Sequence, residues 1–185
     1  MEMSGVNGFY ETAGVQALGA FTVPFTVQAT VEGTEAAGNP FEIFLVSNDL
    51  TTSQDPSQFL TVSGNLSASN GGYYGIWTTA PKISQLWQLG EQLQPSTLAA
   101  PNVEYTINIS VNAQGSATVT VENANGTLLG SASNLQPCAQ ACTQPFYLLL
   151  GQREGLPFNG PGPNVAYWGS VSVVGGGGGL VAFQQ

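Results

Sequence analysis

The stretch that decides the fold is AFTVPFTVQATV, residues 20–31. Apolar side chains alternate there with Thr and Gln, and the apolar set is Phe21, Val23, Phe25, Val27, Ala29 and Val31. Successive side chains of a β-strand point to opposite faces, so this alternation is typical of a half-buried strand. We therefore expect residues 20–31 to form one strand with one face against a core.

The same pattern recurs along most of the chain. Turn clusters separate the runs, and Asn125-Gly126 favours a tight hairpin because both residues tolerate positive φ angles. The further expected strands are 41–47, 59–64, 73–78, 105–112, 117–123, 127–132, 146–151 and 166–174. Only residues 82–92 suggest a short helix, without a clear amphipathic stripe. We predict an all-β protein, a two-sheet antiparallel β-sandwich of the jelly-roll type.

The order of these runs resembles the concanavalin A-like, laminin-G-like jelly-roll superfamily. The segments that carry the resemblance are PFEIFLVSND (40–49), LTVSGNLSASNGGYYGIW (60–77), VEYTINISVNAQGSATVTVENANGTLLG (103–130), PFYLLLGQREG (145–155) and NVAYWGSVSVV (164–174). The resemblance is one of pattern, so it implies a fold more than an activity. We expect an N-terminal arm or edge strand at 1–19, the sandwich at 20–174, and a Gly-rich tether with an apolar segment at 175–185.

The composition excludes several partners. Charged residues make up 7% of the chain, and Lys82 and Arg153 are its only basic residues, for a net charge of −9. Phosphate backbones and anionic lipid headgroups are bound through Lys and Arg, so nucleic acid and membrane surfaces are not expected partners. No apolar run approaches the roughly 20 residues of a membrane-spanning helix, which argues against membrane insertion. A secreted or cell-surface location suits this composition.

Cys138 and Cys142 stand in PCAQAC and have three interpretations: a short-loop disulfide, free thiols, or a metal or redox site. The chain has no His, which disfavours a metal site, so a disulfide is favoured. Three Asn-x-Ser/Thr sequons begin at Asn65, Asn108 and Asn125 and permit glycosylation in a secreted protein.

The carboxylates form no catalytic motif. Superfamily enzymes commonly use paired carboxylates on a sheet, but no Glu-x-Asp-x-x-Glu strand occurs here. Glu42 lies mid-strand among apolar neighbours, where burial would raise its pKa, and Glu154 is the natural second member of a pair. A glutamic-type acid peptidase, which works with a Gln and a Glu, is a weaker alternative. No cofactor is expected; Asp49 in Ser47-Asn48-Asp49 is a weak candidate Ca²⁺ ligand.

Aromatic residues offer a platform for sugar rings. Exposed aromatic faces flanked by amide side chains favour stacking and hydrogen bonding to carbohydrate, although core packing explains the same residues. Alternation predicts that one residue of each Tyr73/Tyr74 and Tyr167/Trp168 pair faces solvent. The candidate glycan-binding residues are Tyr73, Tyr74, Trp77, Tyr167, Trp168, Asn70 and Gln152, with Asn164 as a further donor.

The chain ends in GGGGGLVAFQQ, residues 175–185. Its apolar residues, Leu180, Val181, Ala182 and Phe183, could cover an edge of their own sandwich, remain disordered, or add a strand to a neighbouring subunit. We expect a non-catalytic protein that self-assembles or adheres through this tail as a structural subunit of an extracellular layer, coat or filament. The alternative is a glycan-binding module or a glycoside hydrolase of the concanavalin-like group.

Overall fold

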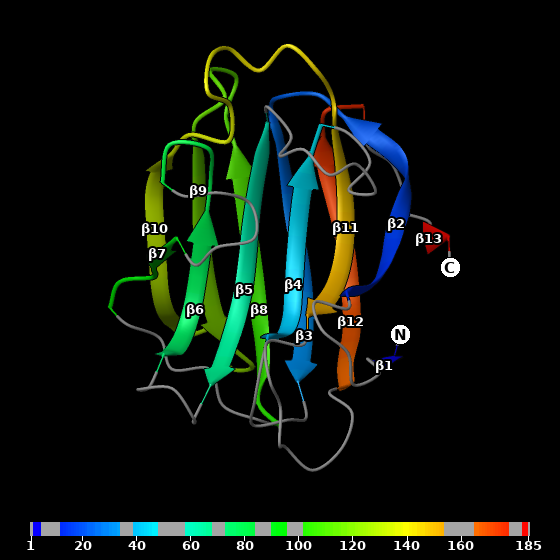
Figure 1. Ribbon diagram of the computed structural model, residues 1–185, viewed down its shortest axis with the longest axis vertical. Coiled ribbons are helices and arrows are strands. Elements are labelled where there is room, and N and C mark those ends of the chain that lie inside the picture. The colour runs from blue at the N-terminus through cyan, green and yellow to red at the C-terminus, as the bar shows by residue number, and fades with distance from the viewer. Residues whose placement is uncertain are drawn as a thin grey trace.

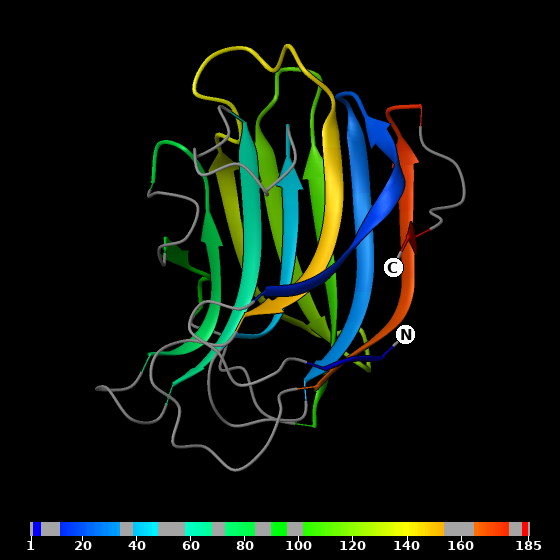
Figure 2. The same ribbon diagram turned by 45° about the vertical axis from the view of Figure 1, so that its right-hand side comes forward.

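The computed structural model describes residues 2–4, 12–33, 39–47, 58–67, 73–83, 90–95, 102–153, 165–177 and 183–184. These residues contain strands and turns but no helix. They form two antiparallel sheets that face each other, as Figures 1 and 2 show. The expected all-β sandwich is confirmed.

The six-stranded sheet has the order β1-β12-β3-β8-β9-β10. Its strands are β1 (Glu2–Ser4), β12 (Val165–Gly175), β3 (Phe25–Gly33), β8 (Glu104–Val111), β9 (Ala117–Asn123) and β10 (Leu128–Leu135). In β3, β8 and β9 the inward residues are apolar and the outward residues polar, which is the alternation read from the sequence.

The seven-stranded sheet has the order β13-β2-β11-β4-β5-β6-β7. Its strands are β13 (Phe183–Gln184), β2 (Thr12–Phe21), β11 (Phe146–Arg153), β4 (Asn39–Val46), β5 (Phe59–Ser67), β6 (Tyr73–Thr79) and β7 (Glu91–Gln92). Aromatic pairs join the two sheets across the core. Phe25 and Phe146 have ring centroids 5.7 Å apart, and those of Phe41 and Tyr105 are 6.2 Å apart.

The expected single strand at residues 20–31 is wrong in one respect, because the chain changes sheets within it. Phe21 ends β2 in the seven-stranded sheet, and Phe25 begins β3 in the six-stranded sheet. Pro24 lacks the N–H that a sheet ladder requires, so the strand breaks there. Both Phe rings still enter the same core, with centroids 6.2 Å apart. Alternation continues through the corner because the two sheets enclose one interior.

The helix expected at residues 82–92 is also wrong at its C-terminal end, where the structure has a strand. Glu91 and Gln92 form β7, which pairs with β6 at the edge of the sheet. Gln94 then exchanges two backbone hydrogen bonds with Ser131 of β10, with N to O distances of 3.0 and 2.9 Å. This bridge ties the two sheets together at that edge. Residues 84–89 lie outside the described residues.

The Gly-rich tail begins as an ordered turn. Gly175, Gly176 and Gly177 have φ angles of 87°, 60° and 79°, which glycine adopts readily. The carbonyl oxygen of Gly176 accepts a hydrogen bond of 3.0 Å from the backbone N–H of Thr22. A Cβ on Gly176 would collide with the Thr22 carbonyl, so this turn needs glycine.

Farther on, β13 pairs with β2, with Phe183 opposite Ala17 and Gln184 opposite Gln16. The tail therefore extends its own seven-stranded sheet. Leu180, Val181 and Ala182 lie outside the described residues. No helix in the described part of the chain is long and apolar enough to cross a membrane.

Candidate functional site

A row of residues crosses the seven-stranded sheet. Gln92 lies opposite Trp77, Trp77 opposite Ser63, Ser63 opposite Glu42, and Glu42 opposite Gly151. Residues directly opposite in antiparallel strands share one face, with Cβ atoms about 4.5–5.5 Å apart. The register therefore gathers an amide, an indole, a hydroxyl and a carboxylate from β7, β6, β5 and β4. We call Gln92, Trp77, Ser63 and Glu42 the cross-strand row.

This row lies on the sheet face that points away from the main core. Phe41, Ile43 and Leu45 belong to the core between the sheets, so Glu42 between them points outward. The same outer face carries a second apolar cluster of Phe44, Val46 and Phe59, against which Tyr147 and Leu149 pack. The central strands of this sheet are thus buried on both faces.

Accessibility increases along the row toward the sheet edge. Glu42 is 3% exposed and Ser63 is 5% exposed, whereas Trp77 and Gln92 are half-buried. The indole Nε1 of Trp77 is itself buried. The accessible end of the row lies at β6 and β7.

Gly75 helps to place the Gln92 side chain. Gly75 precedes Trp77 by two residues and so shares its face of β6. A Cβ on Gly75 would collide with the Nε2 atom of Gln92. The Gln92 amide therefore lies over the strand beside Trp77, in the space that a side chain at position 75 would fill.

The two aromatic groups expected to form a glycan platform lie on different sheets. Tyr73, Tyr74 and Trp77 belong to β6, while Tyr167 and Trp168 belong to β12. Trp168 is 2% exposed and packs in the main core, so its inclusion as a platform residue is wrong. Tyr167 is 43% exposed, as alternation predicted for one member of that pair. The side chains of Tyr73 and Tyr74 lie outside the described residues.

The other expected site residues are placed only in part. Gln152 lies in β11, with its side chain outside the described residues, and Asn70, Asn164, Glu154 and Asp49 also lie outside them. Only Glu42 of the proposed Glu42/Glu154 pair is therefore located. Among the described residues there is no group of three or more His, Cys, Asp and Glu side chains that could hold a metal ion.

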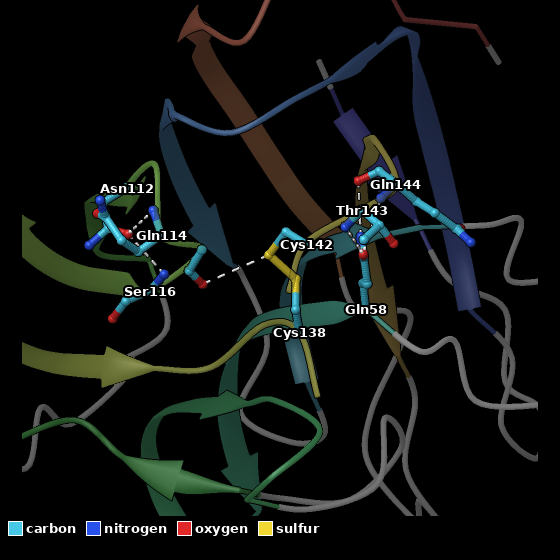
Figure 3. Close-up of a disulfide and its surroundings, with 9 residues drawn as sticks. Gln58, Asn112, Gln114, Ser116, Cys138, Cys142, Thr143 and Gln144 are labelled. Carbon is cyan, nitrogen blue, oxygen red and sulfur yellow. Dashed lines mark hydrogen bonds between the residues drawn. A yellow bond between two sulfur atoms is a disulfide. The ribbon is translucent and has the colours of Figure 1, made fainter. Parts of the chain in front are cut away.

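The disulfide between Cys138 and Cys142 is present, with Cα atoms 5.4 Å apart. It closes a small loop in the crossover from β10 to β11, and Figure 3 shows its surroundings. Gln58 holds the same crossover: its Oε1 accepts hydrogen bonds from the N–H groups of Thr143 and Gln144, at 2.8 and 3.2 Å. Its Nε2 donates to the Gln144 carbonyl at 3.0 Å. These contacts stabilise the connection between the sheets.

A cavity of about 280 Å³ lies beside this loop, lined by Gln58 and residues of 138–143. The Gln58 amide already makes three hydrogen bonds to the loop, so it is not free to hold a ligand. We assign this region a structural role.

On the outer face of the six-stranded sheet, several polar side chains of β3, β8 and β9 bond to one another. Gln28 donates to Asn108 at 2.9 Å, and Asn108 donates to Thr120 at 3.5 Å. Thr26 and Ser110 also share a hydrogen bond of 3.1 Å. These side chains hold one another in place, so this face offers fewer free donors than its composition suggests.

Two members of the cross-strand row, Ser63 and Gln92, were not predicted. Ser63 lies in an expected strand. Which strands pair with it depends on residues distant in the sequence, so the neighbours of Ser63 could not be predicted from the local pattern. Gln92 was assigned to the end of a helix. The signal that could have found it is Gly75, a small residue in an aromatic strand, which often marks the close approach of another group.

Comparison with known proteins supports the fold. No protein-family model matches the chain, and no curated protein matches it by sequence. Peanut lectin superposes with a TM-score of 0.56 at 9% identity, covering 94% of this chain and 85% of the lectin.

Two further solved structures are similar. The Ulex europaeus lectin UEA-II complexed with galactose gives a TM-score of 0.54 at 11% identity, covering 92% of this chain and 85% of the lectin. Scytalido-glutamic peptidase with a peptide-based transition state analog gives 0.52 at 13% identity, covering 95% of this chain and 87% of the peptidase. The chain therefore has the concanavalin A-like jelly-roll fold that the order of its strands suggested.

Proposed function

We propose that this protein is a carbohydrate-binding module that uses the accessible end of the cross-strand row. The observation that carries the proposal is the register that places Gln92 beside Trp77, with Ser63 and Glu42 behind them. A sugar needs an apolar surface for its C–H face and donors or acceptors for its hydroxyls. The accessible end of the row places the Trp77 indole beside the Gln92 amide, and we expect these two groups to meet the two needs.

The charge of the protein narrows the ligand class. With a net charge of −9 and two basic residues, the chain has little means of neutralising sulfated or uronic-acid sugars. Glu42 in the same row adds a further acidic group. Neutral oligosaccharides are therefore the expected ligands.

The comparisons agree with this proposal. Peanut lectin and the galactose-complexed Ulex lectin share the fold. The Cys138–Cys142 disulfide favours an oxidising compartment, which agrees with an extracellular or secretory-pathway location.

A direct test is an array of neutral oligosaccharides followed by titration calorimetry on the best ligand. Replacement Trp77→Ala should weaken binding at least tenfold, because aromatic anchors dominate such sites. The matched control is Tyr167→Ala, which removes an exposed aromatic ring from the other sheet. Unchanged binding in Trp77→Ala together with a loss in Tyr167→Ala would overturn the assignment of the face.

Hydrolysis is the second candidate, because a buried carboxylate lies in the row. Glu42 is 3% exposed, and a glutamic peptidase shares the fold. Turnover and binding assays on the Glu42→Gln variant and the wild type separate the two functions. A hydrolase would lose turnover of peptide or glycan substrates in acid while retaining affinity, whereas a binding module has no turnover to lose.

Self-assembly through the C-terminal segment has less support. That proposal requires the tail to be available to a neighbour, but β13 pairs with β2 of its own sheet. Light scattering on the intact chain tests it, and we expect a monomer.

A further inference from the structure

We propose that Asn125 is a site of N-linked glycosylation. Asn125-Gly126-Thr127 is an Asn-x-Thr sequon at the tip of the hairpin between β9 and β10. Of the three sequons in the chain, this one lies in a hairpin turn, whereas the other two begin within paired strands.

Every residue of the Asn125 sequon is exposed. The backbone of the turn is held by Asn123, whose Oδ1 accepts hydrogen bonds from the N–H groups of Asn125 and Thr127, at 3.0 and 2.9 Å. In contrast, the Asn125 carboxamide makes no hydrogen bond to any residue that the structure describes. A Cβ built on Gly126 meets no atom within 4 Å, so the space around the tip is open.

The other two sequons lie within sheet ladders. Asn108 is in β8, a central strand, where its Oδ1 accepts from Gln28 and its Nδ2 donates to Thr120. Attachment of a glycan to that nitrogen would disturb this ladder. Asn65 lies in β5 between two paired strands, opposite Gly75. Sequons are used at exposed loops, which among these three describes only Asn125.

The chemistry is a group transfer from a lipid-pyrophosphate-linked oligosaccharide. The Asn125 Nδ2 forms a bond to the anomeric carbon of the sugar and loses one proton to a base of the transferase. The bond from that carbon to the pyrophosphate oxygen breaks, and lipid pyrophosphate leaves with the electron pair. The Cys138–Cys142 disulfide favours the oxidising compartments in which secreted proteins are modified.

The test is secretion of the full chain from a eukaryotic host, followed by intact mass and peptide mapping before and after peptide N-glycosidase treatment. We expect a glycan at Asn125, whose removal leaves Asp at that position. Replacements Asn125→Gln and Thr127→Ala should each abolish that glycan, because both break the sequon while leaving the Asn123 anchor in place. The matched control Asn108→Gln should leave the glycan at Asn125 unchanged.

A secreted, folded protein with an unmodified Asn125 would overturn the proposal, as would modification at Asn108 alone. Thermal unfolding of each variant verifies that it is folded. Binding to the oligosaccharide array is measured separately, so failure of this proposal and failure of carbohydrate binding are distinguishable.

Discussion

The Gln92 side chain lies over Gly75, and a Cβ at position 75 would collide with the Gln92 Nε2. Gly75 and Trp77 share one face of β6, and Gln92 lies opposite Trp77 in β7. A glycine in one strand thus determines where an amide from the next strand can lie. If the cross-strand row binds sugar, Gly75 contributes to the orientation of the Gln92 amide that would donate to the sugar.

Replacement Gly75→Ala should weaken carbohydrate binding and also lower the stability of the protein. The added methyl group displaces the Gln92 amide, and residues with a Cβ rarely adopt the φ of 158° found at Gly75, so we expect a loss of about 1–2 kcal/mol in the free energy of unfolding. Loss of one hydrogen bond of about 1 kcal/mol corresponds to roughly a fivefold rise in Kd. Titration calorimetry and thermal unfolding measure the two quantities.

The control for that substitution is Gly19→Ala in β2. A Cβ there meets nothing within 4 Å, and Gly19 is exposed, so neither affinity nor stability should change. Equal affinity in Gly75→Ala and the wild type would show that the Gln92 amide does not contact the ligand.

Gln58 should contribute strongly to stability, because its side chain makes three hydrogen bonds to the crossover from β10 to β11. Replacement Gln58→Ala leaves two N–H groups and one carbonyl of the 143–144 backbone without their partner. We expect a loss of about 2–4 kcal/mol in the free energy of unfolding, since three part-buried hydrogen bonds of about 0.5–1.5 kcal/mol each are lost. Chemical denaturation measures this loss.

Two variants calibrate the Gln58 result. Removing the disulfide with Cys138→Ser and Cys142→Ser together should cost about 2 kcal/mol, because its loop is short. Replacement Gln140→Ala, at an exposed position of the same loop, should be neutral. A loss below that of the disulfide variant would mean that the crossover does not depend on Gln58.

Glu32 and Glu104 lie directly opposite each other in β3 and β8. Like charges in directly opposite positions are destabilising, so Glu104→Gln should stabilise the protein at neutral pH by about 0.5 kcal/mol. The control is Glu122→Gln, which removes one negative charge but lies opposite Thr106 and Leu128. The difference between the two variants should shrink in about 1 M salt, which screens exposed charges. If the difference persists in high salt, repulsion between the Glu32 and Glu104 carboxylates is not its cause.

Ending the chain at Gly177 should leave a folded monomer of somewhat lower stability. The turn at Gly175–Gly177 and its hydrogen bond to Thr22 remain, while β2 loses its pairing with β13. Each lost backbone hydrogen bond contributes about 1 kcal/mol, so a decrease of about 1–2 kcal/mol is expected. Light scattering and thermal unfolding test this. Particles formed by the full chain that vanish on truncation would restore the assembly function.

The amino-acid sequence alone determined the sandwich, because period-two alternation reports which side chains share a face within one strand. The apolar set of residues 20–31 was correctly identified as inward-facing, and Cys138 and Cys142 as a pair. The low content of charged residues was also evident from the sequence. These properties depend on composition or on neighbours a few residues apart.

Only the tertiary structure decided which strands lie side by side. Alternation cannot show that Pro24 ends one strand before the chain enters the other sheet, since Phe21 and Phe25 face the same core from both sheets. Nor can it show that Trp168 is buried while Trp77 joins Gln92, Ser63 and Glu42 on an outer face. Register and strand order come from contacts between residues distant in sequence, which local patterns do not encode.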